Sequence, residues 1–160
     1  MNPAILNNTL TLVPVTEKTL EKYVDVGVKS YCEHYLHLWE NEDPTPYISH
    51  GLTTEETVGI LKLVKNCGID EISDADALKA EKIYLLKEHS GKGIGKQLLQ
   101  FIEETARGLN KKVVWLDAMQ KGKPVHFYQK NGYVIKRESE VVLPNAKPSE
   151  KPMWILTKTL

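Results

Sequence analysis

The chain has only two cysteines, Cys32 and Cys67, among its 160 residues. They lie far apart and form no C-x-x-C motif, which argues against a dithiol redox site or a zinc ribbon. Two cysteines also cannot supply the disulfide framework of a small secreted protein. We therefore expect free thiols and a cytoplasmic location.

The chain also has no surplus of either charge and no long apolar run. Lys plus Arg and Asp plus Glu number 21 each, so no basic surplus favours nucleic-acid binding. The apolar runs are too short to span a membrane, and the sequence shows no signal-peptide pattern. These absences predict a protein that binds neither nucleic acid nor a membrane.

What the sequence does contain is enough apolar material for one core. Hydrophobic residues make up 41% of the chain, and a chain of this length is expected to fold as a single domain over 1–160. The pattern of apolar residues and breakers predicts strands and helices in mixed order. Strands are expected at 9–15, 57–65, 78–87, 112–117, 133–142 and 153–160, a helical region at 16–39 that Gly27 can interrupt, and loops at 41–46, 68–76 and 143–152.

The most informative segment is a glycine-rich loop between an apolar strand and an amphipathic helix. Glycines let the backbone turn sharply with its N–H groups outward, and the first N–H groups of the next helix add the positive end of its dipole. The following helix is indicated by apolar residues at helical spacing and a terminal glycine: Leu98, Leu99, Ile102, Ala106 and Gly108. The segment predicts an anion site for a phosphorylated cofactor, formed by Ser90, Gly91, Lys92, Gly93, Ile94, Gly95 and Lys96.

Two common phosphate motifs do not fit this segment. The dinucleotide fingerprint G-x-G-x-x-G requires a glycine where this chain has Lys96. A P-loop requires four residues between its first glycine and Gly-Lys, but here only three residues separate Gly91 from Gly95. A P-loop also continues with Ser or Thr, where this chain has Gln97. A nucleotide-dependent enzyme is therefore disfavoured.

The loop resembles instead the pyrophosphate-binding motif A of the GNAT superfamily of N-acetyltransferases, R/Q-x-x-G-x-G/A. Gly93 and Gly95 match this motif, whereas Ser90 stands at its Arg or Gln position. A second block at 125–133, Val-His-Phe-Tyr-Gln-Lys-Asn-Gly-Tyr, is similar to the family's F-Y-x-x-x-G-F/Y signature. The chain is identified as a member of this superfamily and resembles most its bacterial polyamine (spermidine/spermine) acetyltransferase branch.

The resemblance implies an α/β (α+β) fold with a central mixed, mostly antiparallel sheet flanked by helices. Its fourth and fifth strands splay apart, and the pantetheine of acetyl-CoA adds to the notch like an extra strand. Ile83, Tyr84 and Leu85 would offer the backbone edge, including an N–H that polarises the thioester carbonyl. The loop at 90–96 would hold the pyrophosphate. Lys130 would reach the 3′-phosphate or remain a solvated helix lysine.

The same resemblance implies direct transfer of the acetyl group to a primary amine, without a covalent acyl-enzyme. Tyr128 matches the general acid that protonates the departing sulfur, a role that suits a phenol because it is protonated at neutral pH. Glu81 is the candidate base, and desolvation would raise its pKa toward neutrality. Glu81 is equally compatible with a solvated position between two lysines. His126 is a further candidate for proton transfer, although a surface helix position is its more typical explanation. His89 would donate to a cofactor phosphate or simply be exposed.

The acceptor is expected to be a small amine, and a polyamine is the specific expectation. Acidic stretches at 40–43 and 70–76 would attract a cationic amine. Acidic loops are also commonly just solvated, so small amines, amino acids, aminated sugars and protein N-termini stay open as acceptors.

No metal is expected. His34 and His37 stand at helical spacing beside Glu33 and Glu40, but no further ligand completes a site. An ordinary amphipathic helix is the preferred explanation of these residues.

Three further expectations follow from the resemblance. A fold that binds acyl-CoA without catalysis is the alternative function, favoured by Ser90 and opposed by Tyr128. Members of the family often dimerise, so a homodimer is expected. A typical member also has a helix and a strand that the short segment at 47–56 cannot hold, so we expect a stretch to be absent near Thr54–Glu55.

Overall fold

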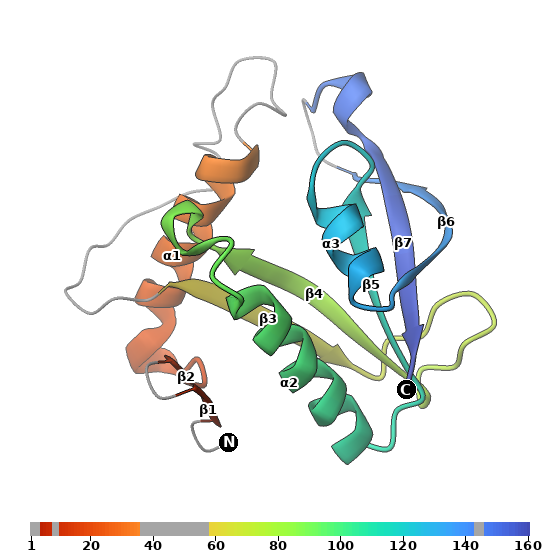
Figure 1. Ribbon diagram of the computed structural model, residues 1–160, viewed down its shortest axis with the longest axis horizontal. Coiled ribbons are helices and arrows are strands. Elements are labelled where there is room, and N and C mark those ends of the chain that lie inside the picture. The colour runs from red at the N-terminus through yellow and green to blue at the C-terminus, as the bar shows by residue number, and fades with distance from the viewer. Residues whose placement is uncertain (1–3, 8–9, 36–57, 143–145) are drawn as a thin grey trace.

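The computed structural model describes residues 4–7, 10–35, 58–142 and 146–160 (Figure 1). An antiparallel pair of short strands comes first, followed by a 3-10 turn and a long helix: β1 (Ala4–Asn7), β2 (Leu10–Leu12), Glu17–Thr19 and α1 (Leu20–Tyr35). The other elements are β3 (Gly59–Lys65), β4 (Ala77–Leu85), α2 (Ile94–Gly108), β5 (Val113–Met119), α3 (Pro124–Lys130), β6 (Val134–Glu140) and β7 (Pro152–Thr159). Two further 3-10 turns are Lys87–His89 and Pro148–Glu150.

Among the described residues, the central sheet has five strands in the order β3-β4-β5-β7-β6. Three of its four neighbouring pairs are antiparallel, and only β4 and β5 run parallel. The predicted mixed, mostly antiparallel sheet is therefore confirmed. The chain passes from β4 through α2 into β5, the crossover that a parallel pair requires.

The strands β4 and β5 stay together for only a short distance. Their pairing is confined to Ala77–Lys79 against Val113–Trp115. Beyond this point β4 continues to Leu85 beside β3, whereas β5 continues to Met119 beside β7. Figure 1 shows the two strands diverging from a common point near the C-terminus. This confirms the predicted splay of the sheet.

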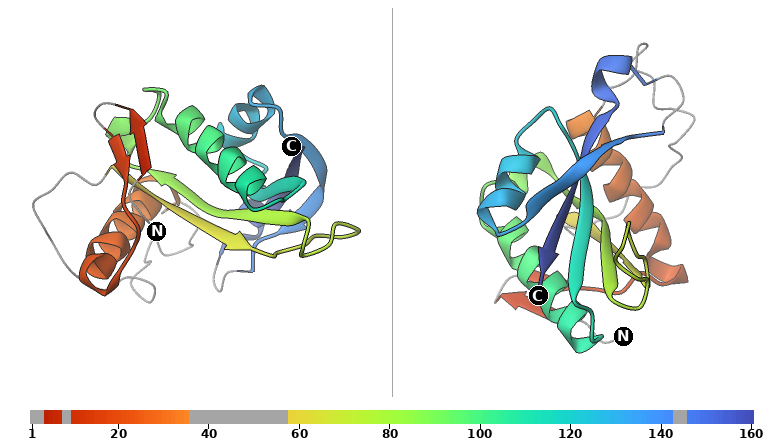
Figure 2. Two further views of the ribbon diagram at one scale, coloured as in Figure 1. Left: turned by 90° about the horizontal axis from the view of Figure 1, so that it is seen from below. Right: turned by 90° about the vertical axis from the view of Figure 1, so that its right-hand side faces the viewer.

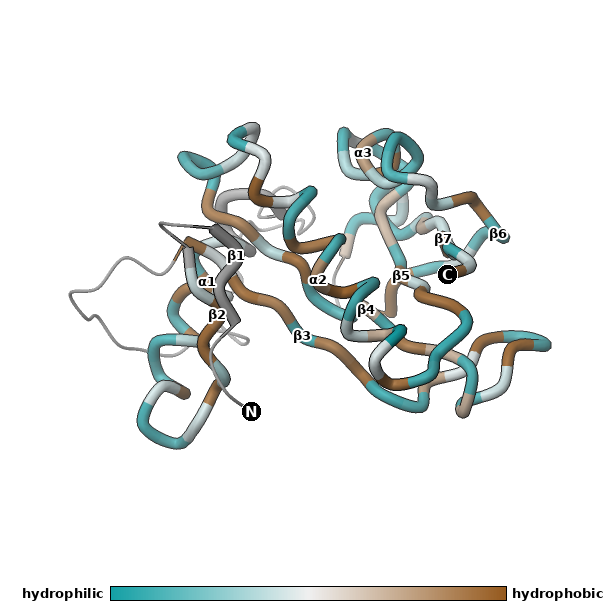
Figure 3. Tube along the Cα trace, turned by 60° about the horizontal axis from the view of Figure 1, so that its bottom comes forward, coloured by the Kyte–Doolittle hydropathy of each residue, from teal (hydrophilic) through white to brown (hydrophobic). Residues whose placement is uncertain are grey.

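Each face of the sheet carries its own apolar cluster. On one face, α2 and α3 cover the larger cluster, which is centred on buried residues such as Leu78, Leu99, Ile102 and Leu116. On the other face, Ile69 from the β3–β4 connection packs with Trp115 and Ile155. Figure 2 shows α1 and α2 on opposite sides of β3 and β4, and Figure 3 shows that hydrophobic residues predominate along β3. Burial of each large apolar side chain contributes about 1.5–3 kcal/mol.

The acidic β3–β4 connection is tied to β6 and to the start of β5. Asp70 and Glu71 pair with Arg137 and Lys136, and Asp76 pairs with Lys112. Hydrogen bonds from these basic side chains lower the pKa of all three carboxyl groups. The connection precedes Ala77, so it lies at the end of β4 far from the glycine loop. Its position does not support the predicted attraction of the acceptor amine by 70–76.

Lys111 is a buried cation that closes the same region. It is 8% exposed, and its ammonium donates to the Asn66 side chain and to the carbonyls of Asp74 and Ala75. Asp74 Oδ1 in turn accepts a hydrogen bond from the Gly68 N–H. One lysine therefore holds both ends of the connection against the end of α2.

We expect Lys111→Met to lower the free energy of unfolding by about 2–3 kcal/mol, because it leaves buried hydrogen-bond acceptors without a donor. Lys112→Met is the matched control: its ammonium is exposed and makes a surface ion pair with Asp76, so its loss costs less than about 1 kcal/mol. Urea denaturation of both variants measures the difference. Equal losses in the two variants would contradict the structural role of Lys111.

Several element boundaries differ from the prediction. The strand expected at 9–15 is confined to Leu10–Leu12 and pairs with an unpredicted strand at Ala4–Asn7. The helix expected from 16 begins as a 3-10 turn at Glu17 and continues without a break at Gly27. A Cβ at Gly27 would lie 3.1 Å from Ile60 Cδ1, so this glycine allows α1 to approach β3. The expected loop at 41–46 and the absent stretch near Thr54–Glu55 lie outside the described residues.

The C-terminal half follows the prediction closely. Gly108 ends α2, and Pro124 occupies the first turn of α3 as expected. The strands expected at 133–142 and 153–160 are β6 and β7. Within β7, Ile155 and Leu156 are buried in the two apolar clusters, so this strand belongs to the core.

No helix among the described residues is long and apolar enough to cross a membrane.

Candidate active site

The glycine loop has the geometry of an open anion cradle. Gly91 and Gly93 adopt positive φ angles of 77° and 82°, and a Cβ placed on either would meet no atom within 4 Å. Gly93 is the N-cap of α2, and its carbonyl accepts the first helical hydrogen bond from Gln97. The first N–H groups of α2 are therefore presented at an exposed surface, as an anion requires.

The side chains of the predicted loop residues divide by exposure. Lys92 and Lys96 are exposed and add positive charge beside the loop, whereas Ile94 is buried and can offer only its backbone. Ser90 is exposed, and its hydroxyl lies 3.5 Å from the Leu86 carbonyl. The space above the glycines and these two ammonium groups fit a pyrophosphate, so the loop is suited to coenzyme A.

Gly95 also has a packing role that was not predicted. It lies inside the first turn of α2, and a Cβ there would lie 3.0 Å from the ring of Phe127. The missing side chain therefore lets α3 pack directly against the start of α2. This contact places the second sequence block next to the glycine loop.

The end of β4 presents backbone toward the splay. Leu86 donates its N–H to Val58 on the β3 side. Because the N–H and C=O groups of successive residues in a strand point to opposite sides, those of Ile83 and Leu85 point away from β3, toward the side where β5 diverges. By the same alternation, the N–H and C=O groups of Tyr84 point toward Ile60, its partner in β3.

Ser30 of α1 fixes the last peptide of this edge. Its side chain is fully buried, and its hydroxyl donates to the Leu85 carbonyl at 3.0 Å. Helix α1 therefore holds the end of β4 immediately before the glycine loop. The sequence analysis did not identify Ser30 because a single serine inside a helix carries no visible signal.

Tyr128 lies on α3, on the same face of the sheet as α2. Its half-buried ring packs edge-on against Phe127 and Tyr133, with centroid distances of 5.3 and 6.0 Å, and contacts the larger apolar cluster. Its backbone carbonyl accepts hydrogen bonds from the N–H groups of Asn131 and Tyr133. The ring is thus held in place next to the helix that carries the glycine loop.

Glu81 lies on the opposite face, at a bulge in β4. Two residues of β4 oppose one of β3 here, because the register shifts between Lys62 and Leu63. The Lys62 ammonium pairs with the Glu81 carboxylate and lowers its pKa. The structure therefore gives the reverse of the rise expected from desolvation. Tyr23 of α1 faces the same pair, and burial raises the pKa of its phenol.

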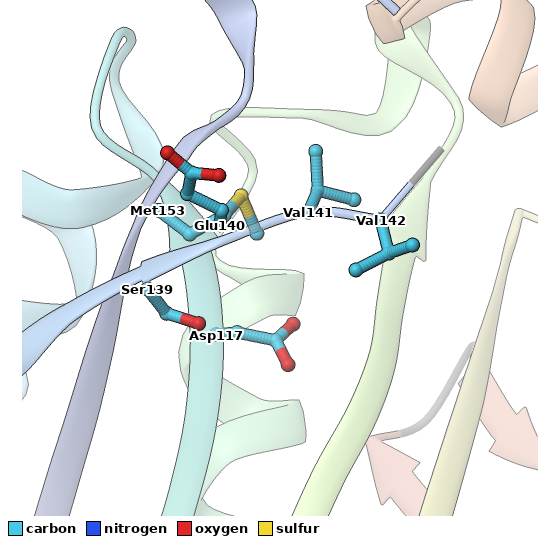
Figure 4. Close-up of a pocket in the computed structure, with 6 residues that line it drawn as sticks. All are labelled: Asp117, Ser139, Glu140, Val141, Val142 and Met153. Atoms are coloured by element: carbon cyan, nitrogen blue, oxygen red, sulfur yellow. The ribbon is translucent and has the colours of Figure 1, made fainter. Parts of the chain in front are cut away.

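Asp117 lies on β5 just beyond the point where the two strands part. Its carboxylate pairs with Lys79 of β4 at 2.9 Å, and the Lys79 ammonium also lies 4.5 Å from the Trp115 ring centre. Asp117 lines a hollow of about 200 Å³ with Ser139, Glu140, Val141, Val142 and Met153. Figure 4 shows the Asp117 side chain below the β6 ribbon on the same side as Ser139 and Val142.

The remaining predicted residues are exposed or half-buried. Lys130 is exposed at the end of α3, His126 is exposed on the same helix, and His89 is half-buried after β4. His37 and Glu40 lie outside the described residues, and so do the side chains of Glu33 and His34. Within the part of the chain that the structure describes, no three His, Cys, Asp or Glu side chains gather as metal ligands.

Asp117 and Lys62 were not predicted as site residues. The structure brings them to the two sides of the splay. A signal for Asp117 was present, because it is the one charged residue in the strand Val113–Met119. No signal marked Lys62, because its pairing with Glu81 depends on the register between two strands.

A parallel pair of strands that parts beside a glycine loop and a helix N-terminus defines an acyl-CoA-dependent transferase. A sequence model of the family described as "Acetyltransferase (GNAT) domain" matches residues 49–135, which is more than half of the chain. The chain belongs to the GNAT family, and it is an N-acetyltransferase that uses acetyl-CoA.

Other proteins share this sequence pattern and fold. An uncharacterised N-acetyltransferase encoded in the pepI 3′ region of Lactobacillus delbrueckii subsp. lactis is 26% identical over 170 aligned positions, which cover 93% of this chain and 96% of the relative. The alignment is longer than the 160 residues of this chain, so the relative has residues that this chain lacks.

Solved structures agree on the fold. Ard1 from Thermoplasma volcanium superposes with a TM-score of 0.60 at 17% identity, over 91% of this chain and 94% of that one. A GNAT family acetyltransferase from Elizabethkingia anophelis with acetyl-CoA bound gives 0.54 at 19% identity, over 68% and 72% of the two chains.

Proposed function

We propose that this enzyme transfers the acetyl group of acetyl-CoA directly to a small cationic amine, with a polyamine as the preferred acceptor. The observation that carries this proposal is the hollow beside the splay, where Glu140 adds a carboxylate to the ion pair of Asp117 with Lys79, while Val141, Val142 and Met153 supply apolar walls. An ammonium group and the hydrocarbon chain of a polyamine match these two kinds of wall.

The cofactor side of the proposed site uses the opposite face of the sheet. The N–H groups around Gly91 and Gly93 and the ammonium groups of Lys92 and Lys96 would bind the pyrophosphate. The peptide edge of Ile83 and Leu85 would orient the pantetheine, and the exposed Lys130 would reach the 3′-phosphate. Acetyl-CoA supplies an activated thioester whose carbonyl carbon accepts the amine.

In the proposed reaction, the protein handles two protons. As the amine nitrogen bonds to the carbonyl carbon and the carbon–sulfur bond breaks, Tyr128 donates its phenolic proton to the departing sulfur. Glu81 accepts the proton released by the amine through a water molecule. Because Lys62 lowers the Glu81 pKa, this carboxylate is ionised at neutral pH and can accept the proton.

Two further features of the proposal concern the protein as a whole. Cys67 is a free thiol, which suits a cytoplasmic enzyme. The edge strand β6 exposes Val134 and Ile135, with 62% and 38% of their surfaces accessible. An exposed apolar edge supports the proposed homodimer.

The proposal is tested by thiol release from acetyl-CoA with a panel of acceptors: spermidine, a monoamine of equal length, an amino acid, an aminated sugar and a peptide with a free N-terminus. We expect spermidine to give the highest kcat/KM. We also expect Glu140→Gln to raise the KM for spermidine and leave the KM for the monoamine unchanged. Glu104→Gln is the charge-matched control, because Glu104 is exposed on α2.

Two outcomes would overturn the proposal. A preference for the peptide or the sugar would assign the hollow to another acceptor. If no amine stimulated thiol release while coenzyme A still raised the melting temperature, the chain would be an acyl-CoA-binding module instead.

A further inference from the structure

One ammonium group, that of Lys158, joins three elements of the active-site half. Lys158 lies on β7, and its Nζ atom is 2.7 Å from Glu103 Oε1 on α2 and 2.9 Å from the carbonyl of Asn131, the C-cap of α3. The Glu103 side chain is 11% exposed and that of Lys158 is 24% exposed. This ion pair is therefore shielded from water more than most surface pairs.

The end of α3 that Lys158 holds contains the backbone of Tyr128. The N–H of Asn131 donates to the Tyr128 carbonyl at 3.0 Å, and the N–H of Tyr133 donates to the same carbonyl at 3.1 Å. The Lys158 ammonium also lies 5.6 Å from the centre of the Tyr133 ring. A positive charge at a helix C-terminus stabilises that end of the helix, so Lys158 fixes the turn that carries Tyr128.

Helices α2 and α3 are thus tied at two places. Near the glycine loop, Gly95 makes room for the ring of Phe127. Two turns further along α2, Glu103 reaches α3 through Lys158. Tyr128 lies between the two ties, so together they set its position relative to the loop.

We propose that Lys158, held by Glu103, is a positioning residue that fixes the distance between the Tyr128 phenol and the glycine loop. This inference rests on the proposed function of Tyr128 as the proton donor. Loss of the Lys158 contacts lets α3 shift against α2, and a shift of about 1 Å in a reacting group can cost up to about 100-fold in rate.

The expected result for Lys158→Met is a kcat that falls roughly 10- to 100-fold, with an unchanged Kd for coenzyme A. Lys158→Arg should recover most of the lost kcat, because a guanidinium can still reach both acceptors. Lys136→Met is the matched control: it removes another lysine of similar exposure, which pairs with Glu71 of the β3–β4 connection. We expect it to leave kcat unchanged.

A double variant separates positioning from folding. Lys158→Met alone leaves the Glu103 carboxylate without its cation, which can destabilise the protein. Lys158→Met with Glu103→Leu removes both charges and should recover the melting temperature, while kcat stays low. Recovery of both the melting temperature and kcat would overturn the inference.

A mutant cycle with Tyr128→Phe tests whether Lys158 acts through the phenol. We expect Lys158→Met to change kcat little once the hydroxyl is gone. Additive losses would contradict the inference. The two proposals fail in different ways: a wild-type enzyme that releases no thiol with any amine refutes the proposed function, whereas an active wild type with an equally active Lys158→Met variant refutes only the positioning role.

Discussion

Tyr128→Phe is expected to lower kcat for acetyl transfer by about 100-fold or more, the range typical for loss of a general acid. The Kd for coenzyme A should not change, because the phenyl ring keeps the packing of Tyr128 against Phe127 and Tyr133. Steady-state thiol release gives kcat, and calorimetric titration gives the Kd. A variant with wild-type kcat would remove Tyr128 from the mechanism.

The neighbouring tyrosine provides the matched control. Tyr133 is 1% exposed, and no group among the described residues pairs with its hydroxyl. Tyr133→Phe should therefore keep kcat and raise the free energy of unfolding by about 1 kcal/mol. A drop in kcat like that of Tyr128→Phe would show that the assay responds to general disturbance of α3.

The same buried phenol has a pH signature. Burial raises the pKa of Tyr133 above its ordinary value. Because the pKa of this phenol is higher in the folded state than in the unfolded state, its contribution to stability is fully present at pH values below the unfolded pKa. That contribution is lost as the pH rises above about 10. Tyr133→Phe should be less sensitive to alkaline unfolding than the wild type.

Gly93→Val is expected to weaken coenzyme A binding at least about tenfold. A β-branched residue is strongly disfavoured at a φ of 82°, and a left-handed conformation costs about 1–2 kcal/mol for an L-residue. The valine must either keep this strain or turn the loop N–H groups away from the pyrophosphate. Each 1.4 kcal/mol lost in binding corresponds to about tenfold in Kd.

Asn110→Val separates strain from binding. Asn110 has a φ of 56° at the opposite end of α2, so the substitution imposes similar backbone strain far from the loop. Both variants should lose thermal stability, but only Gly93→Val should raise the Kd for coenzyme A. Equal Kd values in the two variants would place the pyrophosphate away from the glycine loop.

The sequence was most informative where function depends on short, contiguous segments. The glycine loop and the block at 125–133 each combine a backbone requirement with a fixed spacing, so the fold and the family could be predicted from them, whereas the role of Tyr128 stays a prediction. The splay of the sheet followed from the resemblance and is visible in the short pairing of Ala77–Lys79 with β5.

What could not be predicted depends on partners distant in the sequence. Lys62 meets Glu81 through strand register, Lys79 meets Asp117 across the splay, and Lys158 meets Glu103 across the sheet face. In each pair the residue type alone is compatible with a solvated surface. Gly27 illustrates the reverse case, since its lack of a side chain indicated a break but instead serves close packing against Ile60.

The central claim is that the loop around Gly93 binds the pyrophosphate within reach of Tyr128. Titration of the ¹⁵N-labelled enzyme with coenzyme A, followed by amide NMR shifts, tests it most directly. We predict the largest shifts at Gly91, Gly93 and Lys96, with further shifts at Leu85 and Tyr128. Shifts centred on the β3–β4 connection, with the glycine loop unchanged, would contradict it.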